Sequence, residues 1–465
     1  MKKKMILAVT VLLAVLTACT PGRNVPQNTD DKTNAVQSDE NGIENPEAST
    51  SGSLGNEQAG TGSKGPKVFV DLDGYCPKDE KTVYFIGSGE PGSFRVIDAD
   101  SREEVFKGVM SKYPYETEEG EALMMGNFSL LKAEGTYYIE APHIGRSYVF
   151  SIGEDHYEVV EEKLKNAVLE EAGNPSGIFF YRTQALSWIL QYYEYYEKSN
   201  VDEAEKEMPD LLLQGRDIGQ KLMEIRPEEA DYEELAFYCG AMTQLYEELK
   251  EYDAREAGNF LREAESIYKI LEGRRYEEGF DEVWLFYDSA LLYKATGYAR
   301  YHNVIKNYLG TQPQRELFEE KKEERELLAD EAYLFGSVAY LRTTFNVDTN
   351  LCSGLMMELT EQAGAYVEEH DQNPFFCISD DRRNRLLSDR LYIVAVVEHV
   401  IVSKEYVQVL QDGIHYINGC NETGKSYLTG QGILDAGKDE KGSRAAIGGA
   451  YLFVLGEIIE SEAEE

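Results

Sequence analysis

The sequence predicts a small β-sandwich followed by a large all-α domain, and three observations support this prediction. Short runs of β-branched and aromatic residues, separated by Gly-, Pro- and Asp-rich turns, fill residues 67 to 152. From about residue 155 to the C-terminus, apolar residues recur at helical spacing. Residues 20 to 66, by contrast, contain almost no large apolar side chain. We therefore divide the chain into residues 1–18, 19–66, 67–153 and 154–465.

The N-terminus has the pattern of a bacterial export signal. Three lysines follow Met1, an apolar run occupies residues 5–16, and the run ends in Leu16-Thr17-Ala18-Cys19. A basic start, a short apolar core and small residues before a cleavage point are typical of a secretory signal peptide. The ending is similar to a bacterial lipobox, in which the cysteine is acylated and becomes the first residue of the mature chain.

Cleavage after Ala18 would leave a lipid anchor on Cys19 and place the protein on the extracellular face of the cytoplasmic membrane. The alternative is a plain signal peptide that happens to contain a cysteine. No later segment has the roughly 20 apolar residues that span a bilayer, so we expect contact with the membrane only through the anchor. Residues 19–66 are rich in Asn, Gly, Ser, Thr and acidic residues, and we expect them to be a disordered linker.

The acidic composition excludes one class of partner. The formal net charge is −39, and loss of the three lysines of the signal peptide would make it −42. A chain this acidic repels nucleic acid and anionic lipid headgroups. We therefore expect no nucleic-acid partner.

The cysteines and histidines show no metal-binding pattern. The five cysteines after Cys19 are widely spaced, without a Cys-x-x-Cys pair or a His at metal-ligand spacing, and we interpret them as mostly buried thiols. The histidines form no close pair or triad in the sequence. We expect no metal ion and no other cofactor. The residues concerned are cysteines 76, 239, 352, 377 and 420, and histidines 143, 156, 302, 370, 399 and 415.

Six short runs predict the strands of the sandwich. Their β-branched and aromatic side chains suit a pleated, half-buried surface, and the turns between them are rich in Gly, Pro and Asp. The runs are residues 68–72, 82–86, 94–97, 104–106, 136–139 and 148–150.

Eight stretches have strong helical periodicity, and weaker segments bring the expected total to about a dozen helices, which is too many for one simple bundle. Consecutive helix pairs of this length are typical of an α/α solenoid, either open or closed into a toroid. No strict sequence period is visible, which favours the closed form. The eight stretches are residues 210–223, 235–249, 260–271, 283–293, 333–341, 386–402, 407–417 and 445–459.

Short motifs in the N-terminal domain resemble a known family. Residues 70–77 read Val-Asp-Leu-Asp-Gly-Tyr-Cys-Pro, residues 94–99 read Phe-Arg-Val-Ile-Asp-Ala, and residues 135–140 read Gly-Thr-Tyr-Tyr-Ile-Glu. These resemble the N-terminal immunoglobulin-like domain of family-nine glycoside hydrolases, the inverting cellulases.

Motifs of the helical domain are similar to the same family. Residues 208–212 read Met-Pro-Asp-Leu-Leu, residues 292–297 Leu-Tyr-Lys-Ala-Thr-Gly, and residues 424–430 Gly-Lys-Ser-Tyr-Leu-Thr-Gly. The family has Ile-Pro-Asp-Leu-Leu, Leu-Tyr-Arg-Ala-Thr-Gly and Gly-Arg-Ser-Tyr-Val-Thr-Gly in the same order. The resemblance implies an all-β immunoglobulin-like sandwich followed by an all-α (α/α)6 barrel, and hydrolysis of a β-1,4-glucan-type polysaccharide.

The residues that would carry this hydrolysis are missing from the matching positions. An inverting glycosidase needs a carboxylate base and a carboxylic acid. The family's base lies in an Asp-Ala-Gly-Asp segment, whereas residues 173–184 here contain no Asp or Glu. Arg444 stands where the family has its acidic Glu, and Arg remains protonated at working pH. The family's sugar-binding His-His-Arg stretch has no His between Gly430 and Ser443. We expect no catalytic residue.

Binding is the activity that could remain. Phe179 and Tyr181 in the altered segment, and Tyr427 in the Ser-Tyr-Leu-Thr run, offer aromatic faces to a sugar ring. The alternative for these rings is packing between helices. Arg444 could bind an acidic group of a ligand or pair with a neighbouring carboxylate.

Three functions stay open at the level of sequence. The first is a surface lipoprotein that keeps the glycosidase scaffold for glycan binding or interaction with a cell-surface protein. The second is an active β-glycanase that uses other acids, such as Asp435 or Glu440. The third is a structural spacer that binds no glycan. Because function depends on the site rather than on the fold, the fold alone does not choose among them.

Overall fold

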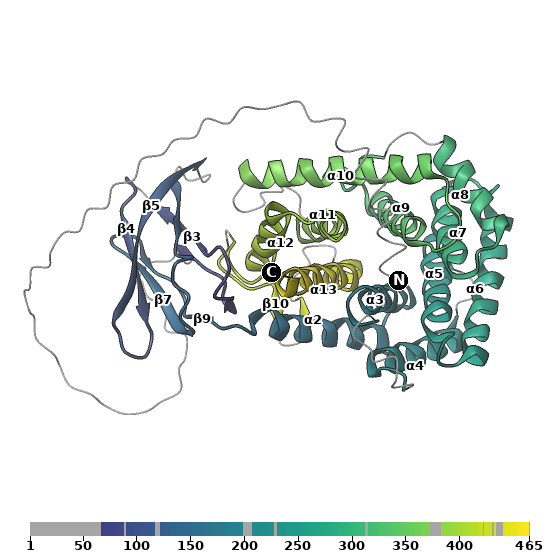
Figure 1. Cartoon of the computed structure of the whole chain (residues 1–465), viewed down its shortest axis with the longest axis horizontal. Coiled ribbons are helices and arrows are strands. Elements are labelled where there is room, and N and C mark those ends of the chain that lie inside the picture. Colours follow the sequence, from purple (N-terminus) through teal and green to yellow (C-terminus); the bar gives the residue numbers. More distant parts are fainter. Residues whose placement is uncertain are drawn as a thin grey trace, which may run out of the picture. The chain divides into compact units, whose positions relative to one another are not determined.

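The computed structural model describes residues 67–87, 90–116, 121–198, 207–226, 230–311, 315–372, 383–421, 423–429, 432–433 and 440–464. The expected signal peptide, the linker and Cys19 lie outside these residues, as do Cys377 and Asp435. Strands occupy the described chain up to Ile152, and helices dominate from His156 onward (Figure 1). Within the described part, no helix has both the length and the apolarity needed to cross a membrane.

The N-terminal part is a sheet domain whose strands run in the order β1-β3-β6-β5-β4-β7-β9-β2, with β8 beside β7. All pairs are antiparallel except β2 with β9. The strands are β1 Val68–Phe69, β2 Gly74–Tyr75, β3 Thr82–Gly87, β4 Ser93–Asp98, β5 Glu104–Glu116, β6 Ala122–Asn127, β7 Gly135–Ala141, β8 Gly145–Arg146 and β9 Phe150–Ile152.

Strand β5 joins the two halves of the sheet domain. Its residues 104–109 pair with β4, and its residues 110–116 pair with β6. Along β4, Phe94 and Val96 are buried while Arg95 between them is exposed, which is the alternation of a strand with one face on a core. The predicted strands all contain strand residues, but β5 is much longer than its predicted run. Strand β6 was not predicted because its Met- and Gly-rich sequence lacks β-branched residues.

The C-terminal part contains twelve α-helices and one short π-helical turn in its described residues. They are α2 His156–Gly173, α3 Phe179–Tyr192, η1 Tyr193–Glu197, α4 Asp210–Ile225, α5 Tyr232–Leu249, α6 Ala254–Arg274, α7 Val283–Thr296, α8 Ala299–Thr311, α9 Glu324–Arg342, α10 Thr349–Gln372, α11 Arg383–Glu398, α12 Lys404–Ile417 and α13 Glu440–Glu464. A small hairpin, β10 Leu428–Thr429 with β11 Gly432–Ile433, precedes α13.

The predicted helical stretches all fall on helices. One was predicted too long, because α11 ends at Glu398 where the chain turns toward α12, whereas the predicted stretch runs to residue 402. Local signals set other ends: Asp231 and Glu234 form a capping box at the start of α5, and Gly297 ends α7 with a φ of 71°, a conformation that favours glycine.

Helices of two kinds alternate along the chain. Helices α3, α5, α7, α9, α11 and α13 are buried on almost every side, and we call them the inner helices. Helices α2, α4, α6, α8, α10 and α12 expose one face, and we call them the outer helices. A helix that is apolar all round belongs in an interior, which explains why α7 has no amphipathic pattern. Helix α3 packs on α5, α5 on α7, α7 on α9, α11 on α13, and α13 on α3.

The inner helices run parallel to one another. In α3 and α5, Phe180 contacts Phe237, and seven residues later in both helices Ser187 donates to Gln244. Contacts that advance together along two helices require the same direction. The same relation holds for α7 and α9, through Phe286 with Tyr333 and Tyr293 with Tyr340. These inner helices therefore start at one common end of the helical part.

Candidate functional site

The resemblance predicts an active site where the inner helices start, and the turn before α3 is the expected place of the catalytic base. Residues 174–178 join α2 to α3. The Asn174 side chain accepts from the Ser176 backbone N–H at 3.0 Å, and the Asn174 carbonyl accepts from the Gly177 N–H at 3.0 Å. Arg182 is buried and its Nε donates to the Ala172 carbonyl at 3.1 Å. The result is a short turn that these hydrogen bonds fix in place and that contains no carboxyl group.

Phe179 and Tyr181 lie half-buried in the first turn of α3. The ring of Phe179 packs against Tyr238 of α5, with centroids 5.1 Å apart. The ring of Tyr181 packs against Phe180 at 5.4 Å. Both residues therefore contribute to helix packing and still present part of their side chains at the end where the inner helices start.

Tyr427 and Arg444 come from two further elements. Tyr427 is half-buried between α12 and β10, where its backbone N–H donates to the Ile417 carbonyl at 2.8 Å and its ring lies 6.2 Å from that of Tyr416. Arg444 lies exposed near the start of α13, which packs directly against α2 and α3. Arg444 and the start of α3 thus belong to neighbouring helices, as the resemblance implies for the acid and the base.

A buried charge cluster lies one to two turns below the starts of α3, α9 and α11. The Arg385 guanidinium binds the Glu331 carboxylate at 2.5 Å and the Asp389 carboxylate at 2.7 Å. The Gln184 amide donates to both Glu331 oxygens, at 3.0 and 2.9 Å. Glu331, Arg385 and Asp389 are only 1%, 0% and 2% exposed. Glu331 and Asp389 are thus two buried carboxylates near the expected active site, and Glu324, the first residue of α9, is a further, half-buried one.

Burial changes the pKa of both carboxyl groups in this cluster. Burial raises the pKa of Glu331 and of Asp389 above their ordinary values, and the charge of Arg385 offsets this only in part. Sequence reasoning missed the cluster because Glu331 and Arg385 are separated by 54 residues and each falls in an ordinary helical pattern.

Large aromatic side chains fill the space beneath the cluster. The Trp188 ring of α3 lies 4.9 Å from Phe335 of α9 and 4.9 Å from Tyr392 of α11, and the latter two rings are 5.6 Å apart. All three residues are buried. Gly449 of α13 permits this arrangement, because a Cβ at that position would lie 2.1 Å from the Trp188 ring. The interior between the inner helices is therefore packed at this level.

A small pocket lies toward the opposite end, where the inner helices finish. Glu194, which lines it, binds Lys294 at 2.8 Å and Arg342 at 3.5 Å. Burial alone would raise the pKa of Glu194, but the charges of Lys294 and Arg342 lower it to about 2. Burial and the charge of Glu194 raise the pKa of nearby Glu248 to about 7.

These two carboxyls differ in pKa as an acid and a base would, but a lysine stands between the local acids. The Lys294 ammonium binds Glu194 and, at 2.7 Å, also Glu247. A cation that already occupies the position between acidic groups leaves no room there for a sugar ring. We therefore interpret this pocket as a site of charge neutralisation.

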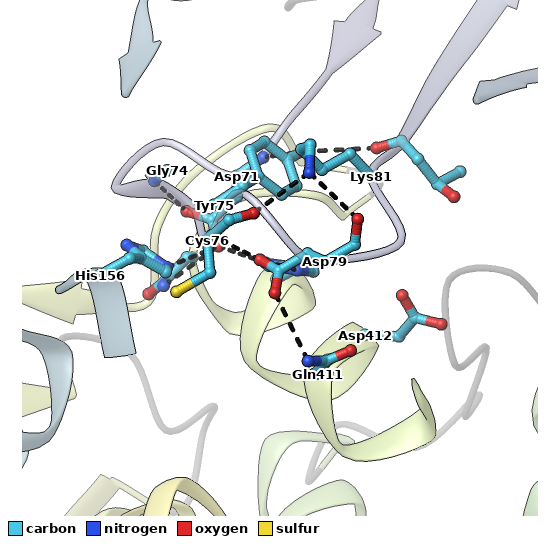
Figure 2. Close-up of polar contacts among 12 residues, drawn as sticks. Asp71, Gly74, Tyr75, Cys76, Asp79, Lys81, His156, Gln411 and Asp412 are labelled. Carbon is cyan, nitrogen blue, oxygen red and sulfur yellow. Dashed lines mark hydrogen bonds and ion pairs between the residues drawn. The ribbon is translucent and has the colours of Figure 1, made fainter. Parts of the chain in front are cut away.

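Two histidines that lie far apart in the sequence meet where the sheet domain contacts the helical domain. The rings of His156 and His415 stack with centroids 6.4 Å apart, and the His415 Nδ1 lies 2.8 Å from Asp71 Oδ2. Figure 2 labels Asp71 and His156 of this group. Histidines that form no pair in the sequence thus form one in the fold. No sequence signal could have found the pair, because a tertiary contact between two domains creates it.

Comparison with known proteins identifies the family. A model described as "Cellulase N-terminal ig-like domain" matches residues 63–146, and one described as "Glycosyl hydrolase family 9" matches residues 187–435. The second match covers more than half of the chain. The chain belongs to glycosyl hydrolase family 9. Its sheet domain is the immunoglobulin-like domain that the resemblance predicted, and its helical domain is the family 9 domain.

Solved family 9 structures have the same fold. A metagenome-derived family 9 endoglucanase is 16% identical, covers 84% of this chain and 98% of its own, and superposes with a TM-score of 0.68. An endoglucanase from Alicyclobacillus acidocaldarius is 16% identical, with coverages of 85% and 99% and a TM-score of 0.65. A Bacteroides ovatus family 9 protein is 14% identical, with coverages of 85% and 99% and a TM-score of 0.64. No curated protein matches the chain.

The family 9 match begins and ends beside the two segments in which the resemblance expects the catalytic carboxyls. It starts at residue 187, after the segment 173–184, and stops at residue 435, before Arg444. The residues that resemble the family therefore lie in the scaffold between these two segments.

Proposed function

We propose that this family 9 protein is an exported lipoprotein, anchored through Cys19, whose helical domain binds a β-glycan without cleaving it. The supporting observation is the loss of both catalytic carboxyls. The turn at 174–178 offers no base, and Arg444 takes the position of the acid. Hydrolysis with inversion needs both groups, one to activate water and one to protonate the leaving oxygen.

The finer architecture of the proposal is an (α/α)6 barrel. Six consecutive pairs, each an outer helix followed by an inner helix, make up the helical part. The inner helices run parallel and pack as neighbours around a common interior, which is the arrangement that six α-hairpins would produce. In such a barrel the loops that enter the inner helices surround one mouth.

The two buried carboxylates beneath this mouth, Glu331 and Asp389, are unsuited to replace the lost pair. A general acid or base must reach the glycosidic oxygen or a water molecule. Glu331 and Asp389 are buried and share the guanidinium of Arg385. In that position the two carboxylates interact with Arg385 rather than with a substrate.

Exposed aromatic side chains at the mouth support glycan binding. Tyr276, in the loop that enters α7, is 87% exposed, and Phe179 and Tyr181 at the start of α3 are half-exposed. A flat aromatic face can stack on the apolar face of a sugar ring. Sequence reasoning missed Tyr276, because nothing in a loop sequence distinguishes an exposed tyrosine from a packed one. The endoglucanase names of the structural neighbours suggest a β-1,4-glucan as the glycan.

Calorimetric titration of the whole chain with a β-1,4-linked gluco-oligosaccharide tests this proposal. We expect binding, and recovery of the oligosaccharide at its original length. Tyr276→Ala and Tyr181→Ala should each weaken binding about three- to tenfold, as loss of ~0.5–1.5 kcal/mol of aromatic stacking predicts.

Tyr298→Ala is the matched control. Tyr298 is also exposed, at 52%, but it follows α7 at the opposite end of the helices. Its replacement should leave the affinity unchanged. Absence of binding by the parent chain, or an equal loss in all three variants, would contradict the proposal and favour a structural or protein-binding role.

An active β-glycanase is the alternative, and family membership is the observation that favours it. Asp435 lies at the end of the family 9 match, and Glu440 begins α13. In that case the oligosaccharide would be shortened in the titration cell, and Asp435→Asn or Glu440→Gln would stop the shortening.

A further inference from the structure

We propose that Asp71, His156 and His415 bind a zinc ion that fastens the immunoglobulin-like domain to the helical domain. This inference concerns a different part of the molecule from the proposed glycan site, and it does not depend on that function.

The three residues come from three separate elements. Asp71 lies in the loop between β1 and β2, His156 is the first residue of α2, and His415 lies in the last turn of α12. They are 0%, 7% and 4% exposed, so the cluster is shielded from bulk water. A shared ligand at this point would link both domains directly.

The donor atoms are close enough to share one ion. One ligand atom from each residue can be chosen so that all three lie within 4.8 Å of one another. Asp71 Oδ2 is 2.8 Å from His415 Nδ1 and 3.9 Å from His156 Nε2. Zinc bonds of about 2.0–2.2 Å in a tetrahedral site place ligand atoms ~3.3 Å apart. Changes of roughly 0.5 Å in these two separations would bring both pairs to that spacing.

An unsatisfied nitrogen points independently to a missing ligand. His156 Nε2 is buried and makes no hydrogen bond within the described residues. A buried polar atom without a partner carries a desolvation cost that a ligand can remove. His415 Nε2, the ring nitrogen that does not face Asp71, is also without a hydrogen bond and lies 3.8 Å from Asp79 Oδ2.

The carboxylate is held ready by the backbone around it. Asp71 Oδ1 accepts from the backbone N–H groups of Asp73 and Gly74, at 2.8 Å each, which leaves Oδ2 facing the histidines. Asn418 Nδ2 also donates to Asp71 Oδ2, at 3.3 Å. Gly74 is required here, because its φ is 137° and a Cβ would lie 2.4 Å from the Ser151 carbonyl oxygen. Partners of this kind orient metal-binding side chains in proteins.

The donor types favour zinc over the common alkaline-earth ions. Imidazole nitrogens suit Zn²⁺, whereas Ca²⁺ and Mg²⁺ prefer sites made of oxygen atoms. A site with two imidazoles and one carboxylate should therefore bind Zn²⁺ and leave Ca²⁺ and Mg²⁺ in solution.

The test starts with the whole chain after treatment with a chelator and dialysis. We expect it to take up one equivalent of Zn²⁺, measured by calorimetry and by elemental analysis, with a rise in Tm. Ca²⁺ and Mg²⁺ should produce neither effect. Failure of the parent chain to bind zinc, or binding of Ca²⁺ in its place, overturns the proposal.

The variant His156→Gln separates a metal ligand from a merely structural side chain. Because His156 Nε2 makes no hydrogen bond, the metal-free variant should melt close to the metal-free parent. Its zinc affinity should fall at least tenfold, and its zinc-dependent rise in Tm should disappear. Asp71→Asn, which keeps an oxygen for the loop, should also lose zinc binding. Retained zinc affinity in both variants contradicts the site.

His399→Gln is the matched control. His399 is a second histidine beside carboxylates, with its Nδ1 3.0 Å from Glu457 Oε2, where α11 and α13 finish. This variant should bind zinc as the parent does. Loss of zinc binding in His399→Gln, with retention in His156→Gln, would move the metal to that other cluster and overturn the assignment.

Discussion

A single guanidinium holds two buried carboxylates together inside the helical domain. Arg385 donates to Glu331 of α9 and forms an ion pair with Asp389 of its own helix, and all three side chains are at most 2% exposed. A buried charge that loses its partner keeps its full desolvation cost, whereas a neutral replacement of the whole group does not. Removal of Arg385 alone should therefore cost more stability than the three attracting charges contribute together, because it leaves two carboxylates buried without a partner.

Arg385→Met should lower the free energy of unfolding by about 3–5 kcal/mol, because it leaves Glu331 and Asp389 buried without a counter-charge. Urea unfolding followed by circular dichroism measures this change. The matched control is Arg95→Met, which removes a surface pair with Glu140 and should cost less than about 1 kcal/mol. Equal losses in the two variants would mean that the Arg385 cluster is hydrated, which contradicts the packed interior.

A second residue-scale prediction concerns pH. Burial and the neighbouring Glu457 raise the pKa of Glu398 from its ordinary 4.5 to about 8, and burial raises the pKa of Glu457 to about 6. The folded protein thus retains protons that the unfolded chain releases near pH 4.5. The free energy of unfolding should fall as the pH rises from about 4.5 to 8, by up to about 1.4 kcal/mol for each unit of pKa shift, and then level off.

Glu398→Gln tests the source of that slope, because an amide stays neutral and can still donate to Glu457. Urea unfolding between pH 5 and pH 8.5 should show a shallower decline in the variant than in the parent. An unchanged slope would assign the pH dependence to other groups.

At the scale of elements, α13 and α3 approach closely enough that only glycine fits at one contact. A Cβ on Gly449 would lie 2.1 Å from the Trp188 ring, which is itself wedged between Phe335 and Tyr392. The ring cannot move aside without disturbing both neighbours. The close approach of these two inner helices thus depends on one glycine. From the sequence alone, the same glycine would be expected only to weaken its helix.

Gly449→Ala should destabilise the protein by about 1–3 kcal/mol, since overpacking outweighs the better helix propensity of alanine. Gly364→Ala in α10 is the matched control. A Cβ there meets nothing within 4 Å, so this variant should be stabilised by roughly 0.5–1 kcal/mol. Thermal unfolding of both variants should give shifts of opposite sign. Shifts of the same sign would show that the contact between α13 and α3 is looser than described.

Local periodicity predicted the helices and strands better than the tertiary contacts between them. Helices such as α7 were predictable because apolar residues fill most of the stretch before Gly297. The order of the motifs predicted the family. The sequence did not predict the Arg385 cluster or the pair of His156 and His415. Their members lie far apart in sequence, and only the packing of whole helices and domains brings them together.

At the scale of the whole molecule, the chain keeps a family 9 scaffold, and we propose that its chemistry is altered. Its immunoglobulin-like and helical domains match family models, and solved endoglucanases superpose over most of its length. The tied turn before α3 and the exposed Arg444 occupy the places where the family resemblance expects carboxyls. A fold can persist when its catalytic groups are lost, because packing of the inner helices, rather than the site, stabilises it.

The most direct test of the missing chemistry is release of reducing ends from a soluble β-1,4-glucan by the whole chain at high protein concentration. We predict no release above a protein-free control at any pH between 4.5 and 8, because the positions that match the family's base and acid carry no carboxyl group. Release that depends on protein concentration, and that stops when Glu440 is replaced by Gln, would contradict this account and make the protein an active hydrolase.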